Sequence, residues 1–80
     1  MKTTIEMNPD EIKTIENVDF LQNLNGFDIF VSEVPFSEDA NNKTKGFKIL
    51  PYQPYEARKA GNTVYVRMPY YAGTIEVAYA

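Results

Sequence analysis

The C-terminal stretch from Asn62 to Ala80 constrains the fold more than any other part of the chain. Apolar residues alternate with polar or amphipathic ones in two runs, residues 64–68 and residues 75–79. Alternation of this kind in β-branched and aromatic residues is typical of half-buried strands. Pro69 and Gly73 lie between the runs and favour a reversal, because proline lacks a ladder donor and glycine accepts a positive φ. The stretch predicts a C-terminal β-hairpin and leaves open whether its last strand is central or at a sheet edge.

A lone hairpin is only marginally stable in water, so the rest of the chain must supply further strands. Residues 2–7 are expected to form a first strand. Residues 27–34 carry apolar side chains on both faces, which is typical of a central strand. Residues 45–50 predict a short strand. The two prolines at positions 51 and 54 keep the segment around them extended and away from the centre of a sheet.

The segment from residue 9 to residue 24 predicts a helix. Asn8 is a favoured N-cap residue and Pro9 suits the first helical position. Asp10 and Glu11 would then lie in the first turn, where the helix dipole favours negative charge. The chain therefore carries a full set of helix-start signals before its first long apolar pattern.

The apolar pattern itself fits this helix imperfectly. Its members recur every third residue, and they are Ile12, Ile15, Val18, Leu21 and Leu24. A stripe with this spacing drifts around a helix, and a break near Glu16–Asn17 would restore its phase. The alternative is a type I turn at residues 8–11 that closes a small hairpin with residues 12–15. We favour the helix, because a tight hairpin with a bulge would place glycine at position 11.

These elements predict a single α+β domain over residues 1–80. A mainly antiparallel sheet of four to five strands would carry one N-terminal helix, broken or continuous, on one face and end in the C-terminal hairpin. Residues 56–60 are expected to add one helical turn. Residues 36–45 are rich in charged and turn-forming side chains and predict an exposed loop.

The composition argues against catalysis. The chain has no histidine and no cysteine, so it lacks the usual general base, the thiol nucleophile and the soft-metal ligands. Its adjacent acids, at residues 10–11 and 38–39, follow neither the spacing of a calcium loop nor that of a hydrolytic pair. We expect a protein that is not an enzyme, with no catalytic residue, no metal site and no cofactor.

The same sequence predicts a cytoplasmic protein without a membrane partner. The N-terminus is too polar for a signal peptide, and no apolar run approaches the roughly 20 residues of a membrane span. The lack of cysteine gives no sign of an oxidising compartment.

Charge is distributed unevenly along the chain. Residues 1–40 hold nine acidic and two basic residues, which gives −7, and residues 41–80 hold two acidic and six basic residues, which gives +4 and a net charge of −3. All six tyrosines lie in the second half. The favoured interpretation is that the halves pack together and offset each other. The alternative is two faces of opposite sign, one of which meets a partner.

These features favour binding to another protein. Tyrosine and arginine are enriched at protein interfaces, and the candidate contact residues are Asp10, Glu11, Glu16, Asp19, Tyr52, Tyr55, Arg58, Lys59, Arg67, Tyr70 and Tyr71. The leading hypothesis is a non-catalytic protein-binding module, comparable to a small accessory or inhibitory protein of a phage or mobile element that occludes a macromolecular partner. One alternative is a structural subunit that self-associates through its terminal strand. The other is single-stranded nucleic-acid binding by the tyrosine-rich basic half.

Overall fold

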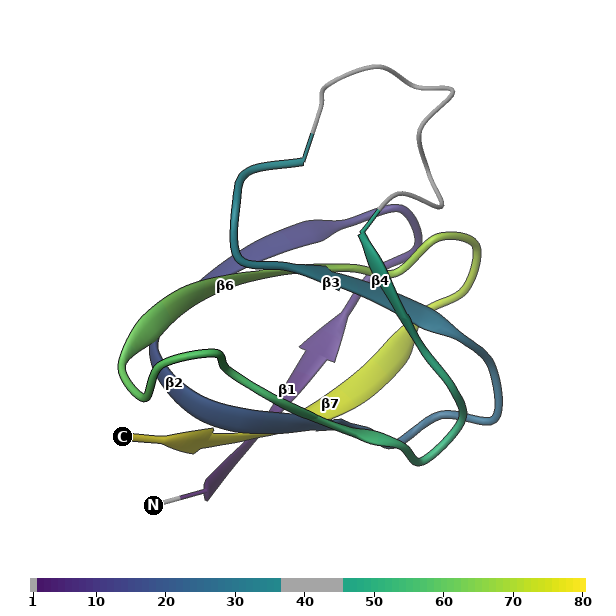
Figure 1. The fold of residues 1–80 in the computed structure, drawn as a ribbon. Coiled ribbons are helices and arrows are strands. Elements are labelled where there is room, and N and C mark those ends of the chain that lie inside the picture. Colours follow the sequence, from purple (N-terminus) through teal and green to yellow (C-terminus); the bar gives the residue numbers. More distant parts are fainter. Residues whose placement is uncertain (1, 37–45) are drawn as a thin grey trace.

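Seven strands and no helix form from residues 2–36 and 46–80, which are the residues that the computed structural model describes (Figure 1). All of their pairings are antiparallel. The expected α+β class is therefore wrong, and the described part of the chain is all-β. The strands are β1 (Lys2–Met7), β2 (Ile12–Asn23), β3 (Ile29–Ser32), β4 (Phe47–Ile49), β5 (Pro54–Glu56), β6 (Asn62–Arg67) and β7 (Gly73–Tyr79).

The helix predicted over residues 9–24 is wrong, because β2 occupies this segment. The spacing of three between its apolar residues has a different cause. Against β6 the register shifts between Ile15 and Val18, and against β7 it shifts between Val18 and Phe20. Each of these β-bulges adds one residue to the period-two alternation of a strand. Ile15, Val18 and Leu21 therefore all face the core at a spacing of three.

Residues 8–11 form a turn and not a helix start. The N–H of Glu11 donates to the carbonyl of Asn8 at 3.2 Å, and Asp10 adopts a left-handed conformation with φ 62°. A turn is thus present where the alternative expectation placed one, but the positive φ of Asp10 at its third position belongs to a type II turn and not to the expected type I. It does not close a hairpin with residues 12–15, because β1 pairs with β7 along its whole length.

The predicted C-terminal hairpin is wrong in its pairing, although both of its strands exist. The sheet order is β1-β7-β2-β6-β3-β4, so β2 lies between β6 and β7 (Figure 1). The first part of β2 pairs with β6, and its last part pairs with β7 on one edge and β5 on the other. The loop after β6 therefore spans a strand, and β7 is a central strand flanked by β1 and β2.

Two smaller expectations have opposite outcomes. The central strand within residues 27–34 is confirmed: β3 is buried at all four positions and pairs with both β6 and β4. The helical turn at residues 56–60 is wrong, because this segment continues β5 and then turns, with the Asn62 N–H donating to the Lys59 carbonyl at 3.1 Å. Of the loop predicted at 36–45, residues 37–45 lie outside the described residues.

The sheet curls around one apolar core (Figure 1). Its most deeply buried side chains come from β2, β3, β6, β7 and the residue after β6, and they include Val18, Leu21, Ile29, Val31, Val64, Val66, Met68, Ile75 and Val77. The polar side chain of Asn23 is fully buried with them. Its amide nitrogen donates to the carbonyls of Phe27, Ile49 and Leu50 at 2.7, 3.2 and 3.1 Å. Asn23 thereby fixes β4 and the β2–β3 loop to the end of β2.

The described residues contain no helix that is long and apolar enough to cross a membrane.

Candidate functional site

The first candidate site is a surface hollow of about 550 Å³ with aromatic walls, here called the aromatic hollow. The β2–β3 loop, β3, β4 and the β6–β7 loop contribute to it. Tyr70 and Tyr71 expose 60% and 62% of their surface at its rim. The lining residues are Phe27, Asp28, Phe30, Lys48, Pro69, Tyr70 and Tyr71.

The loop that carries the two tyrosines is anchored at both ends. Before it, the Met68 N–H donates to the Glu11 carbonyl at 3.1 Å. After it, Asn25 accepts from the Thr74 N–H at 2.8 Å and donates to the Thr74 carbonyl at 2.9 Å. Gly73 permits this close approach, because a Cβ there would lie 2.6 Å from the Asn25 Oδ1.

One of the two rings is also held by an aromatic neighbour. The rings of Phe27 and Tyr71 lie 5.3 Å apart at their centroids and are tilted by 56°. Tilted aromatic pairs of this kind are favourable beyond their buried area. The Tyr71 ring is therefore presented to solvent in a restricted position.

The second candidate site lies between β4 and β5 and is here called the β4–β5 hollow. It has a volume of about 400 Å³. The Phe47 and Tyr55 rings stack there with centroids 5.9 Å apart, and the Arg58 guanidinium lies 5.9 Å from the centre of the Phe47 ring. Its lining residues are Phe47, Lys48, Ile49, Gln53, Pro54, Tyr55, Glu56 and Arg58. Lys48 lines both hollows.

A carboxylate beside the second hollow has an altered acidity. Glu33 accepts from the Tyr55 hydroxyl at 2.6 Å, from the Asn62 amide at 2.8 Å and from the Arg58 N–H at 3.2 Å. Burial alone would raise the pKa of Glu33, but these hydrogen bonds outweigh it and lower the pKa below its usual value. Burial and the hydrogen bond to the Glu33 carboxylate raise the pKa of Tyr55 to about 12.

The hydrogen bonds of Glu33 indicate a structural role, and the two pKa shifts agree with it. A general acid or base works best with a pKa near neutrality, and both shifts move away from it. The Glu33 carboxylate instead connects the chain just after β3 to β5, the β5–β6 loop and β6. Among residues 2–36 and 46–80, no group of three or more acidic side chains is arranged to hold a metal ion.

The acidic turn before β2 forms a separate cluster. Asp10 pairs with the Arg67 guanidinium at 3.4 Å, and Arg67 is only 7% exposed. Glu11 accepts from the Asn8 N–H at 2.8 Å and lies 3.5 Å from the Lys13 ammonium. The hydrogen bond from Asn8 lowers the pKa of Glu11, and the charge of Lys13 adds to this effect. Arg67 is thus placed to support this turn from below the surface.

The remaining residues predicted from the sequence lie apart from both hollows. Glu16 is exposed on β2, and Lys59 is exposed in the β5–β6 loop. Asp19 borders a shallow hollow with Phe20, Pro54 and Glu56. Tyr52 is 61% exposed in the turn between β4 and β5 and has φ 62°. The structure brings Tyr70 and Tyr71 together, and Tyr55 with Arg58, but it does not unite the eleven candidates in one surface.

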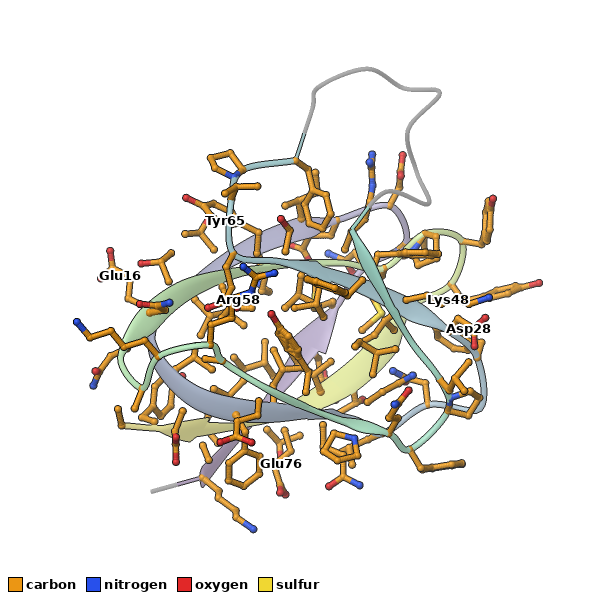
Figure 2. All side chains as sticks on the ribbon, in the orientation of Figure 1. Glu16, Asp28, Lys48, Arg58, Tyr65 and Glu76 are labelled. Carbon is orange, nitrogen blue, oxygen red and sulfur yellow. The ribbon has the colours of Figure 1, made fainter. Side chains whose placement is uncertain are left out.

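The two oppositely charged halves of the sequence are interleaved in the sheet. Along the order β1-β7-β2-β6-β3-β4, strands from the acidic half alternate with strands from the basic half. Lys2 on β1, for example, lies 3.7 Å from Glu76 on β7. Figure 2 shows Glu16 and Asp28, both from the acidic half, on opposite sides of the molecule. The sequence halves therefore do not correspond to two faces of opposite charge.

Sequence reasoning missed three phenylalanines that build these sites. Phe27 and Phe30 were assigned to a core strand, and Phe47 to a short strand, so none was expected at a binding surface. Phe47 is 52% exposed. The available signal was its place in a very short apolar run between two turn-forming segments, which is where edge strands occur.

Comparison with family models, with curated proteins and with solved structures found no match to this chain. The expectation of an inhibitory protein from a phage or mobile element has no support from these comparisons.

Proposed function

We propose that this protein is a non-catalytic binding module that recognises a partner protein through the aromatic hollow. The observation that carries the proposal is the exposure of Tyr70 and Tyr71, at 60% and 62%, beside a hollow walled by Phe27 and Phe30. Large rings on a restrained loop supply contact area at a low entropic cost, which is why tyrosine is common at binding hot spots.

The chemistry of the hollow favours a protein over a nucleic acid. Its charged lining residues are one cation, Lys48, and one carboxylate, Asp28. Figure 2 shows both on the same side of the molecule. A groove for single-stranded nucleic acid combines aromatic rings with an excess of positive charge along the phosphate backbone. A carboxylate in the wall and a net charge of −3 oppose that arrangement.

The location of β7 bears on the self-association hypothesis. β1 pairs with one edge of β7 and β2 pairs with the other. The C-terminal strand therefore has no open edge at which a second copy could add, and the proposed contact surface does not involve it.

The proposal is tested by cross-linked affinity capture with the wild-type chain and a Tyr70→Ala/Tyr71→Ala variant. We expect a specific partner whose recovery falls by about tenfold or more in the variant, because interface tyrosines commonly contribute more than 1 kcal/mol each. The matched control is Tyr52→Ala, which removes an equally exposed tyrosine from a different turn. Circular dichroism confirms that each variant is folded.

Two results would contradict the proposal. One is a capture profile that is the same for the wild-type chain and the Tyr70→Ala/Tyr71→Ala variant. The other is salt-sensitive binding to a fluorescent single-stranded oligothymidine that requires Tyr70 and Tyr71, which would assign the hollow to nucleic acid.

A further inference from the structure

β1 lies at one end of the sheet order and pairs with β7 alone within the described residues. Its register with β7 runs without a shift from Lys2 to Met7, and it contains no proline. A hollow of about 600 Å³ separates Ile5 of β1 from residues 13–16 of β2. Edge strands are commonly protected against pairing with another chain by a bulge, a proline or a central lysine. β1 has none of these, since its one lysine is its first residue.

The register of the sheet determines which backbone groups of β1 face away from β7. The Leu24 N–H donates to the Thr74 carbonyl at 3.3 Å, so the even-numbered residues of β7 bond to β2. The odd-numbered residues of β7 therefore bond to β1, and their register partners on β1 are odd-numbered as well. The N–H and C=O groups of Lys2, Thr4 and Glu6 are left at the edge. No hydrogen bond joins these groups to another described residue.

The three residues at this edge are complementary to a second copy of themselves. When two β1 strands pair antiparallel about Thr4, Lys2 of each copy lies opposite Glu6 of the other, and the two Thr4 residues face each other. All of the backbone groups at the edge then form hydrogen-bonded pairs. The three side chains are exposed on one face, where opposite charges and paired threonines are stabilising. Among the described residues, no cation pairs with Glu6 within one copy.

Other symmetric registers lack this complementarity. A pair centred on Thr3 places Lys2 opposite Thr4, and a pair centred on Ile5 places Thr4 opposite Glu6. A pair centred on either charged residue places like charges opposite each other, which is destabilising. The charge pattern of β1 therefore selects the register centred on Thr4.

We propose that two copies of this protein associate edge to edge through β1, in a two-fold antiparallel pair centred on Thr4. A second copy fits this edge because both its free backbone groups and its charges match when the strand is paired with itself. Association through β1 does not depend on the proposed function, since no β1 residue lines the aromatic hollow. A dimer of this kind carries two aromatic hollows.

Sedimentation velocity of the wild-type chain tests the association. Between about 5 μM and about 1 mM the weight-average mass should rise from that of one copy toward that of two, with a Kd on the order of 100 μM, because the contact is small. Glu6→Lys opposes two lysines at both charged pairs and should weaken association by about tenfold or more. It should not disturb the fold of a single copy, because Glu6 is exposed. Lys59→Glu, in the β5–β6 loop, is the control and should leave the Kd unchanged.

Mixing two variants tests the register. Lys2→Glu alone opposes two glutamates at each charged pair and should also weaken self-association. An equimolar mixture of Lys2→Glu and Glu6→Lys places opposite charges at both pairs and should associate about as strongly as the wild-type chain. Circular dichroism confirms that each variant is folded.

A cross-link locates the centre of the pair. The chain has no cysteine, so Thr4→Cys introduces a single thiol next to its counterpart in the second copy. A short bismaleimide should join two copies of this variant, and adding Glu6→Lys to it should suppress the product.

The proposal is overturned if the wild-type chain stays monomeric up to about 1 mM, or if it associates with a Kd that Glu6→Lys does not change. It is also overturned if the mixture of the two charge variants does not regain association. None of these results affects the proposed function, which depends on partner capture by Tyr70 and Tyr71. Conversely, loss of tyrosine-dependent capture with normal self-association would overturn only the proposed function.

Discussion

The carboxylate of Glu33 joins segments that are distant in the sequence, and its hydrogen bonds give the protein two pH-dependent contributions to stability. Glu33 has a pKa below 4.5 in the folded state. Its contribution is therefore present above about pH 4.5 and is lost as the pH falls through the folded pKa. The pKa of Tyr55 is raised from 10.0 to about 12. Its contribution is complete below pH 10 and is lost as the pH rises toward 12.

Tyr55→Phe should therefore change both the level and the slope of the stability curve. At pH 7 the loss of a hydrogen bond to a charged group should lower the unfolding free energy by about 1.5–3 kcal/mol. Between pH 10 and 11.5 the variant should lose less stability than the wild-type chain, because it has no phenol to ionise. Urea unfolding at a series of pH values measures both effects. Glu33→Gln is the matched variant for the acid side. Its unfolding free energy should fall less below pH 4.5 than that of the wild-type chain. Parallel curves of unfolding free energy against pH for all three proteins would contradict this account.

At the scale of a strand, Asn17 lies where β2 changes partner from β6 to β7. It adopts φ 59° at the first bulge. Its side-chain amide donates to the Ala80 carbonyl at 3.1 Å, and its backbone carbonyl accepts from the Ala80 N–H at 2.9 Å. A left-handed conformation costs an ordinary residue about 1–2 kcal/mol, and asparagine tolerates it better than β-branched residues do. The bulge thus depends on a residue type suited to it.

Asn17→Val should lower the unfolding free energy by about 2 kcal/mol, because it combines backbone strain with loss of the side-chain hydrogen bond. Asn17→Gly keeps the conformation and loses only the side chain, so its effect should stay under about 1 kcal/mol. Chemical denaturation of both variants measures the difference. Equal stability of the two would show that the left-handed conformation does not constrain β2.

The positions of the strands could be predicted from the sequence where the pattern is local, but the pairing between strands could not. β1 was expected at its observed bounds, and β3 and β4 lie inside expected strands, since alternation and turn residues define them without reference to other segments. β2 was assigned to a helix because two bulges produce the three-residue spacing of a drifting helical stripe. β6 and β7 were joined as a hairpin because nothing in their sequence records the insertion of β2 between them.

The residues of the candidate sites were likewise predictable only where the sequence signal is local. Tyr70 and Tyr71 were expected at a turn, and a proline and a glycine around them indicate one. Phe27, Phe30 and Phe47 could not be assigned to the surface, because an apolar residue in a strand does not reveal whether its neighbours cover it. Burial depends on the order of strands, and that order is set by contacts between distant residues.

At the scale of the whole molecule, every strand pairing within the described residues joins a strand from residues 2–36 to one from residues 46–80. Neither segment contains a pair of its own. The acidic and basic halves therefore stabilise each other by interleaving, and backbone hydrogen bonding in the sheet requires both. Folds built from such non-local pairings form slowly, because loop closure must precede the contacts that stabilise it.

This arrangement predicts that two synthetic fragments, residues 1–36 and residues 46–80, are each unfolded in isolation. Each fragment alone exposes unpaired strand edges and half of a core, and isolated strands of this size are unstable in water. Circular dichroism should show no β-sheet signal for either fragment and a concentration-dependent gain of it on mixing. A scrambled version of the 46–80 fragment, with the same composition and charge, should give no gain and so separates specific pairing from attraction between opposite charges. A cooperative unfolding transition of either fragment alone would contradict this prediction, since that fragment would then form pairings of its own.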